Sequence, residues 1–220
     1  MKKTALILVI IVIAVMSSVH ASSIAVPENF TFPRITIQGA WLPGAGYSVG
    51  SASNLSGGSS NFMLGGTLGF GGGFAGQYRG TTLNVPAQKI GNFNQKVDGM
   101  LNEFNVLYKI DKYVAVYAGA TYTFGKLVNN DTKNEEKSNS FGVQIGGMLD
   151  VPIYRELSGF ADYSIGSQIA QFAIGLEYRV ISAATVNVAY YNIQQYSLNY
   201  SGGITGYTMQ GAAIGFSVDI

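Results

Sequence analysis

The chain has 220 residues, a formal net charge of +1, only 11% charged residues, 29 glycines and no cysteine. The balanced charge excludes the strongly basic surface that is typical of nucleic-acid-binding proteins. The lack of cysteine excludes disulfides, thiolate metal sites and a lipid-modified cysteine anchor. The length is compatible with one domain.

The N-terminal segment has the features of an export signal. Lys2 and Lys3 precede an apolar run, Ala5–Val15, which is too short to span a bilayer as a helix. Val19-His20-Ala21 then supplies small residues at the cleavage positions. We therefore expect a signal peptide over residues 1–21 and a short periplasmic lead over 22–33, with a short membrane anchor as the less favoured alternative. Cleavage leaves about 199 residues, with 11 basic and 12 acidic side chains.

The rest of the chain is organised as short segments in which apolar and polar residues alternate. The side-chain period of a strand is two, so this alternation predicts strands that each have one apolar face. Strands are expected at residues 34–42, 61–71, 74–79, 95–110, 113–126, 139–151, 157–165, 168–179, 184–194 and 210–220. Longer loops are expected at residues 43–60, 83–94, 128–138 and 195–206, and short turns at 72–73, 111–112, 152–156 and 180–183.

The connections predict how these strands are arranged. Bacterial outer-membrane barrels have short periplasmic turns, longer outer loops and an even strand count. The short turns fall at alternate connections, and only the brief link at Gly166-Ser167 breaks the pattern. We therefore predict an all-β, antiparallel, up-and-down transmembrane β-barrel over residues 34–220, with ten strands and eight as the alternative. A soluble β-sandwich is disfavoured because the strands are longer than usual for soluble proteins.

The last strand shows the alternation most clearly. Apolar side chains are expected on its lipid face at Ala212, Ile214, Phe216, Val218 and Ile220. In the predicted topology this strand closes the barrel against Arg34–Leu42. Aromatic residues such as Tyr122, Phe124 and Phe141 fall near expected outer strand ends, as in the aromatic girdles of membrane barrels.

The side-chain inventory argues against catalysis. The only histidine, His20, lies in the predicted signal peptide, so the exported chain has neither histidine nor cysteine. Ser-His-Asp sites, Cys-His sites and the usual zinc sites are therefore excluded. No catalytic, cofactor-binding or metal-binding residues are predicted. Gly71–Gly76 matches G-x-G-x-x-G, but strand-like flanks favour a turn over a dinucleotide site.

Charged residues on the inward face are the remaining functional candidates. The predicted lumen network comprises Arg34, Arg79, Glu103, Lys109, Asp162, Glu177, Arg179 and Asp219. Buried charges are tolerated when they are paired, so an internal network that stiffens a small barrel is favoured. Inward glycines such as Gly119 and Gly146 leave room, which keeps a narrow pore for small solutes as the alternative. The stretches 129–137 and 195–206 are expected to be exposed loops.

The chain resembles the small outer-membrane β-barrel proteins, the OmpA/OmpX-like and opacity-protein-like group. The resemblance is carried by the predicted signal peptide, by the regular succession of strand hairpins and by the terminal strand. The resemblance covers residues 34–220. It implies an outer-membrane location, outer-membrane lipid as a partner, and recognition of Ile214, Phe216, Val218 and Ile220 by the barrel-assembly machinery. The final residue in this group is usually aromatic and is Ile220 here. The expected function is a non-enzymatic envelope-structural or surface-interaction role, with an unspecified surface ligand and no nucleic acid.

Overall fold

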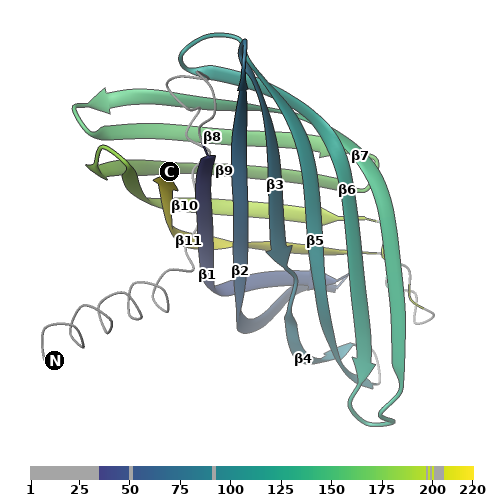
Figure 1. Cartoon of the computed structure of the whole chain (residues 1–220). Coiled ribbons are helices and arrows are strands. Elements are labelled where there is room, and N and C mark those ends of the chain that lie inside the picture. The colour runs from purple at the N-terminus through teal and green to yellow at the C-terminus, as the bar shows by residue number, and fades with distance from the viewer. Residues whose placement is uncertain (1–34, 50–51, 91–92, 197, 199, 201–205) are drawn as a thin grey trace, which may run out of the picture.

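A computed structural model of the chain describes residues 35–49, 52–90, 93–196, 198, 200 and 206–220. The predicted signal peptide, the periplasmic lead and Arg34 lie outside these residues. The described part consists of antiparallel strands joined by turns (Figure 1). These are β1 (Ile35–Val49), β2 (Ala52–Gly71), β3 (Phe74–Thr82), β4 (Val85–Ile90), β5 (Phe93–Lys109), β6 (Val114–Asn129), β7 (Glu135–Tyr154), β8 (Leu157–Gly166), β9 (Ile169–Ile181), β10 (Ala184–Gln195) and β11 (Tyr207–Asp219). Within the described residues, no helix is both long and apolar enough to cross a membrane.

The strands form one closed sheet. Each strand pairs with its neighbours in the order β3-β2-β1-β11-β10-β9-β8-β7-β6-β5-β4, and the additional pairing of β3 with β5 closes the ring. β4 pairs with β5 beyond the point where β3 ends, so β3 and β4 occupy one position in the wall. The barrel therefore has ten strand positions. This confirms the predicted fold and decides for ten strands over eight.

Two predicted loops are largely strand. Residues 43–60 were expected to form a loop because they are rich in glycine and serine, yet β1 and β2 continue through them, with Ala45 opposite Ser59 and Val49 opposite Ala52. Residues 83–94 contain Pro86, yet β4 pairs there with β5. Register shifts accompany both segments, and such irregularities accommodate proline and glycine in a sheet. Backbone pairing with neighbours extends these strands where apolar alternation is absent.

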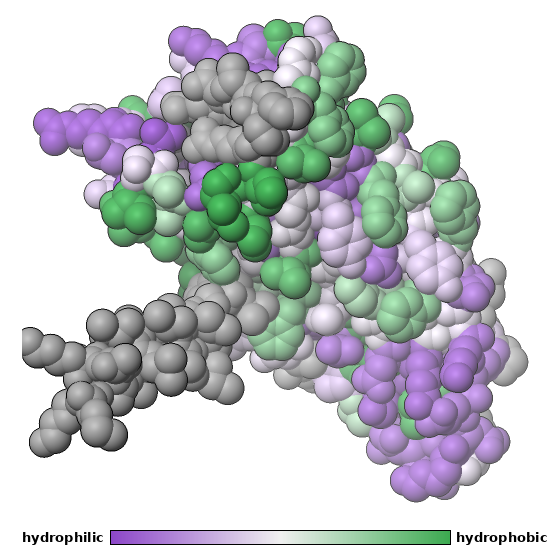
Figure 2. Space-filling view, viewed as in Figure 1, coloured by the Kyte–Doolittle hydropathy of each residue, from purple (hydrophilic) through white to green (hydrophobic). Residues whose placement is uncertain are grey.

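The charged loop is also shorter than expected. The sequence predicts a loop over residues 128–138, but β6 continues to Asn129 and β7 begins at Glu135. Figure 1 shows this hairpin extending well beyond the neighbouring strands, and Figure 2 shows that its end is hydrophilic. β6 and β7 have 16 and 20 residues, whereas β8 and β9 have 10 and 13. A membrane-spanning strand needs about 9–11 residues, so one side of the barrel is tall enough to project from a bilayer.

The two faces of the sheet differ as the alternation predicts. In β7, Phe141 is 66% exposed and points out, whereas Gln144 is 2% exposed and points into the barrel. The same contrast recurs around the wall. Exposed outward residues include Leu64, Phe70, Phe104, Val106, Val143, Ile145, Ile174, Leu176, Val188 and Ile214. An apolar belt of this extent is the surface that a lipid-embedded barrel presents.

The terminal strand closes the barrel as predicted. β11 pairs with β1, with Thr36 opposite Asp219, and with β10 on its other side. The Ile220 N–H donates a 2.9 Å hydrogen bond to the Ile35 carbonyl, so the pairing continues to the last residue. Ile214 and Ile220 are exposed on the outside, and Phe216 and Val218 are half-buried.

Candidate functional site: the filled lumen

An ion pair between neighbouring strands lies at the centre of the barrel interior. Arg79 on β3 faces Glu103 on β5, because the two residues are paired in register and both point inward. The Arg79 guanidinium donates from Nε to Glu103 Oε2 and from Nη2 to Oε1, each at 2.8 Å. The two side chains are 3% and 0% exposed. This two-pronged geometry is the strongest form of an arginine–carboxylate contact.

A second carboxylate joins the pair from another part of the wall. Asp162 on β8 accepts a 2.6 Å hydrogen bond from Arg79 Nη1 and a 2.8 Å hydrogen bond from the Tyr117 hydroxyl on β6. Arg79 and Asp162 are 83 positions apart in the sequence. Three strand positions, β5, β6 and β7, separate β3 from β8 around the ring. The contact therefore ties separate walls together through the lumen.

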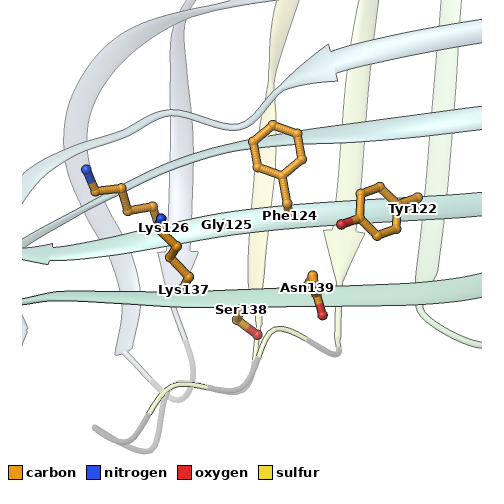
Figure 3. Close-up of a pocket in the computed structure, with 7 residues that line it drawn as sticks. All are labelled: Tyr122, Phe124, Gly125, Lys126, Lys137, Ser138 and Asn139. Atoms are coloured by element: carbon orange, nitrogen blue, oxygen red, sulfur yellow. The ribbon is translucent and has the colours of Figure 1, made fainter.

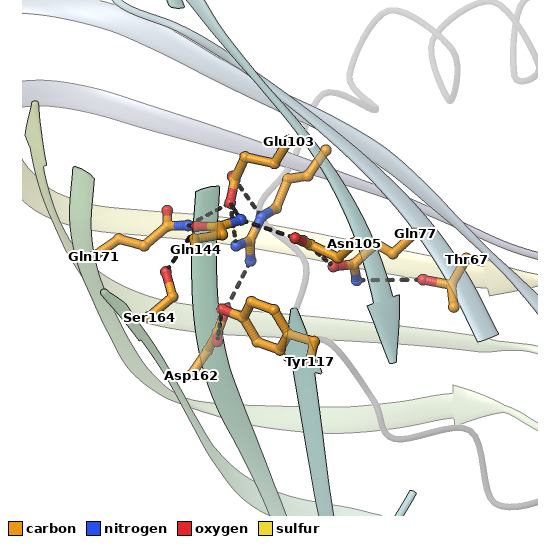
Figure 4. Close-up of polar contacts among 10 residues, drawn as sticks. Thr67, Gln77, Glu103, Asn105, Tyr117, Gln144, Asp162, Ser164 and Gln171 are labelled. Carbon is orange, nitrogen blue, oxygen red and sulfur yellow. Dashed lines mark hydrogen bonds and ion pairs between the residues drawn. The ribbon is translucent and has the colours of Figure 1, made fainter. Parts of the chain in front are cut away.

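Neutral amides and hydroxyls complete the network (Figure 4). Glu103 Oε1 also accepts hydrogen bonds from Gln144, at 2.8 Å, and from Gln171. Gln144 further donates to Asn105 at 2.9 Å, and Ser164 donates to Gln144 at 3.2 Å. The chain of contacts continues from Asn105 through Gln77 to Thr67.

The charges in this cluster are compensated by its hydrogen bonds. One guanidinium faces two carboxylates, and the excess negative charge is stabilised by the Tyr117 hydroxyl and by the amide groups of Gln144 and Gln171. Buried charges are tolerable only with such pairing. The arrangement holds strands together and leaves no activated nucleophile. Among the described residues, no group of three or more acidic, histidine or cysteine side chains is arranged to hold a metal ion.

The character of the lumen changes along the barrel. From the short-turn end of β3 through β4, the inward residues change from Gln77 and Arg79 to Thr81 and then to Leu83 and Val85, all of which are buried. The half of the lumen nearer the long loops is filled by a buried cluster that includes Leu42, Met63, Leu101, Leu127, Ile169, Ile193 and Met209. An apolar layer thus lies beyond the polar network.

The connection between β10 and β11 contributes to this apolar layer. Leu198 is 0% exposed and Tyr200 is 5% exposed. Both approach β6 across the lumen, since a Cβ added at Gly125 would lie 3.1 Å from Leu198 Cδ1 and 2.3 Å from the Tyr200 hydroxyl. Burial, together with nearby Glu136, raises the pKa of Tyr200 to about 12.

For Gln195, Leu198 and Tyr200, this packing corrects the expectation that residues 195–206 form an exposed loop, whereas Tyr196 is 46% exposed. Thr123 on β6 also donates a 3.2 Å hydrogen bond to Gln195 at the end of β10. Tyrosine and glycine in this stretch of the sequence indicate a loop. The lumen, however, provides an apolar surface that takes up Leu198 and Tyr200, and their burial removes apolar area from water.

The predicted network residues occupy two places. Arg79, Glu103 and Asp162 come together at the centre of the lumen. The short-turn end holds Lys109, Glu177, Arg179 and Asp219. The remaining predicted residue, Arg34, is outside the described residues. Lys109 is half-buried, Glu177 is buried, Arg179 is exposed, and half-buried Asp219 accepts a 2.7 Å hydrogen bond from Thr36. The single lumen network expected from the sequence is therefore spread over two levels of the barrel.

The neutral members of the central network are absent from the charged set predicted from the sequence. These are Thr67, Gln77, Asn105, Tyr117, Gln144, Ser164 and Gln171. Their inward orientation could be predicted from the sequence, since each lies an even number of residues from other inward positions of its strand. Charge alone was too narrow a criterion, because uncharged amides supply two of the four hydrogen bonds that Glu103 accepts.

Comparison with known proteins gives similarity of fold only. No protein-family model matches the sequence, and no curated protein sequence matches it. The attachment invasion locus protein Ail of Yersinia pestis is 8% identical, with a TM-score of 0.47, over 86% of this chain and 99% of Ail. A major outer membrane protein from Thermus thermophilus is 14% identical, with a TM-score of 0.45, over 86% of this chain and 100% of that protein.

The N-terminal β-barrel domain of Pseudomonas aeruginosa OprF gives a similar result. It is 10% identical, with a TM-score of 0.39, over 85% of this chain and 97% of that domain. The resemblance to small outer-membrane β-barrels is confirmed at the level of the fold, for which the closed ten-position sheet of this chain is the evidence.

Proposed function

We propose that this chain is a non-enzymatic integral outer-membrane β-barrel with a closed lumen, acting in envelope structure or in surface interaction. The observation that carries the proposal is the Arg79–Glu103–Asp162 cluster, which joins separate walls at the centre of the barrel while almost fully buried.

Membrane insertion is supported by the pairing and by the outer surface. A chain in lipid must satisfy its backbone groups internally, and a closed sheet does so without a free edge. The exposed apolar belt gives lipid a matching surface. The export signal predicted from the sequence would account for delivery. The outward row Ile214, Phe216, Val218 and Ile220 on the closing strand is then the signal for the assembly machinery.

A non-enzymatic role is supported by the state of the two buried acids at the centre of the lumen. General acid–base catalysis requires a group within hydrogen-bond reach of a substrate proton. Glu103 and Asp162 are instead occupied by Arg79, Tyr117 and amide donors. The predicted exported chain also has no histidine or cysteine.

The alternative, a narrow pore, depended on inward glycines that leave room. Side chains fill the space beside two of them. A Cβ at Gly119 would lie 2.1 Å from Asn105 Oδ1, and one at Gly146 would lie 2.3 Å from Tyr117 Cζ. These glycines therefore make room for the network and favour a closed barrel over a channel.

A surface-interaction role is supported by the tall side of the barrel. The β6–β7 hairpin carries exposed charged residues at Asp131, Lys133, Glu135 and Lys137. Exposed loops on a rigid scaffold are where binding functions concentrate.

The test combines folding and conductance. We expect unboiled protein to migrate differently from boiled protein in detergent gels, since hydrogen-bonded closure resists unfolding. The folded protein should give no discrete single-channel steps in planar bilayers. Regular conductance from heat-modifiable wild-type protein would contradict closure and favour the pore. Identical migration of the two samples, with release from membranes by carbonate, would contradict insertion.

A further inference from the structure

Two lysines stand directly opposite each other on the outer wall, near the long-loop ends of β6 and β7. Lys126 is paired in register with Lys137. Like charges directly opposite on neighbouring strands destabilise a sheet. Lys126 Nζ lies 2.5 Å from Glu135 Oε1, whereas Lys137 is exposed and has no ion-pair partner among the described residues. The pair therefore carries a positive charge that the protein does not neutralise.

The neighbouring carboxylates do not remove this charge. Asp98 on β5 faces Lys126 from the other side. The Asp98 carboxylate is bound at 2.7 Å by Lys96, and Glu135 is bound by Lys126. Glu136 alternates to the inner face, where its charge acts on Tyr200. On the outward-facing positions, three ammonium groups and two carboxylates thus share this part of the wall, and Lys137 is the one left over.

The two lysines border a hollow of about 450 Å³ (Figure 3). Asn139 also lines it, on the strand that carries Lys137. The Asn139 side chain is exposed and makes no hydrogen bond within the described part of the chain. The hollow is therefore bordered by two ammonium groups and a free carboxamide, all of which can donate hydrogen bonds.

Aromatic and aliphatic side chains continue from the hollow toward the middle of the barrel. Along the outward face, the next pair after the lysines is Phe124 with Asn139, and the pair after that is Tyr122 with Phe141. Val143 and Ile145 follow on the same face, and each is at least 60% exposed. Positive charge is thus followed by aromatic rings and then by aliphatic surface, the order in which a membrane lipid presents its headgroup, interface and acyl chains.

We infer that this hollow binds the phosphate headgroup of an anionic membrane lipid in the outer leaflet. The phosphate oxygens accept from Lys126, Lys137 and Asn139, and an acyl chain lies along Phe124 and Phe141. Lysine suits this task as a compact charge that approaches phosphate from many directions. The inference rests on the proposed insertion into the membrane.

The test uses the full-length protein folded into phosphatidylcholine nanodiscs that contain a minority of phosphatidic acid. Native mass spectrometry after mild detergent extraction counts the lipids that remain bound. Wild-type protein should retain phosphatidic acid in preference to phosphatidylcholine. Lys137→Gln should lower that retention by roughly fivefold, the effect of one lysine charge near an anionic lipid surface.

Matched variants separate charge at the hollow from charge elsewhere. Lys112→Gln changes an exposed lysine in the short turn at the opposite end of the barrel, and should leave retention unchanged. Lys137→Glu should fold at least as well as wild type, since it removes the repulsion with Lys126, yet should abolish retention. An unchanged count for Lys137→Gln, or displacement of the lipid by an equal concentration of inorganic phosphate, would overturn the inference. The gel shift on boiling is independent of this result, so loss of the shift contradicts insertion and loss of lipid retention alone contradicts the site.

Discussion

Two layers of the lumen are filled by opposite chemistry, and a smaller apolar cluster that includes Leu107 and Met148 lies on the short-turn side of the polar layer. Toward the short turns, Arg79, Glu103 and Asp162 are held by an ionic and amide network. Toward the long loops, Leu101, Met209 and their neighbours form an apolar layer. Both layers exclude water, but they respond differently to the loss of a side chain. Loss of one charge leaves its partners buried and unpaired, whereas loss of one aliphatic side chain leaves a cavity whose cost is graded by volume.

The largest effect is expected from removing the central cation. Arg79→Ala leaves Glu103 and Asp162 buried without a counter-charge, which should lower the free energy of unfolding by about 3–5 kcal/mol. Urea unfolding of the vesicle-folded protein measures this. Lys112→Ala, in an exposed turn, is the control and should change the free energy of unfolding by less than about 0.5 kcal/mol.

A triple replacement sharpens the comparison by removing the charges from the polar layer. Arg79→Met, Glu103→Leu and Asp162→Leu together should recover part of the stability that Arg79→Ala loses, because no unpaired charge stays buried. The recovery should be incomplete, because Tyr117, Gln144 and Gln171 lose their carboxylate acceptors. A triple variant as unstable as Arg79→Ala would show that the network has a packing role beyond charge compensation.

A smaller loss is expected in the apolar layer. Leu101 is fully buried, so Leu101→Ala should lower the free energy of unfolding by roughly 3 kcal/mol through lost burial and the cavity that remains. The variant should stay silent in planar bilayers, because the polar network still closes the lumen. Conductance in Leu101→Ala would mean that the apolar layer alone is the barrier.

Tyr117→Phe probes a single bond of the network. It removes the 2.8 Å hydrogen bond to Asp162 but leaves Arg79 in place, so the expected loss in unfolding free energy is roughly 1.5 kcal/mol. The same urea titration measures it. A loss as large as that of Arg79→Ala would indicate that the tyrosine hydroxyl is as necessary as the guanidinium.

The smallest effect concerns pH and the apolar layer. The pKa of Tyr200 is raised to about 12 by burial, so the folded protein favours the neutral hydroxyl more than the unfolded chain does. This contribution to stability is complete below the ordinary tyrosine pKa of about 10 and is lost as the pH rises toward 12.

Tyr200→Phe should remove this part of the decrease in unfolding free energy with rising pH. Its stability near neutral pH should not fall, because the buried hydroxyl has no hydrogen-bond partner among the described residues. Equal slopes for the two proteins would contradict burial of Tyr200.

The alternation of residues was sufficient to predict which side chains face lipid and which face the lumen. Phe104 and Val106 are exposed and Glu103 and Asn105 are buried, as the strand period requires. Where the alternation stops, at residues 43–60 and 83–94, the prediction of loops was wrong. Pairing of β1 with β2 and of β4 with β5 depends on backbone N–H and C=O groups, which residues have whether or not their side chains alternate.

The sequence by itself determined the antiparallel barrel and the inward position of Arg79, Glu103 and Asp162, because both follow from local periodicity and turn spacing. Only the tertiary structure decided that these three meet, that Glu177 and Asp219 lie at another level, and that Leu198 and Tyr200 fill the outer lumen. Contacts across a closed barrel depend on the number of strands and on their stagger. Those quantities set the distance between residues such as Arg79 and Asp162, and they arise only when the last strand pairs with the first.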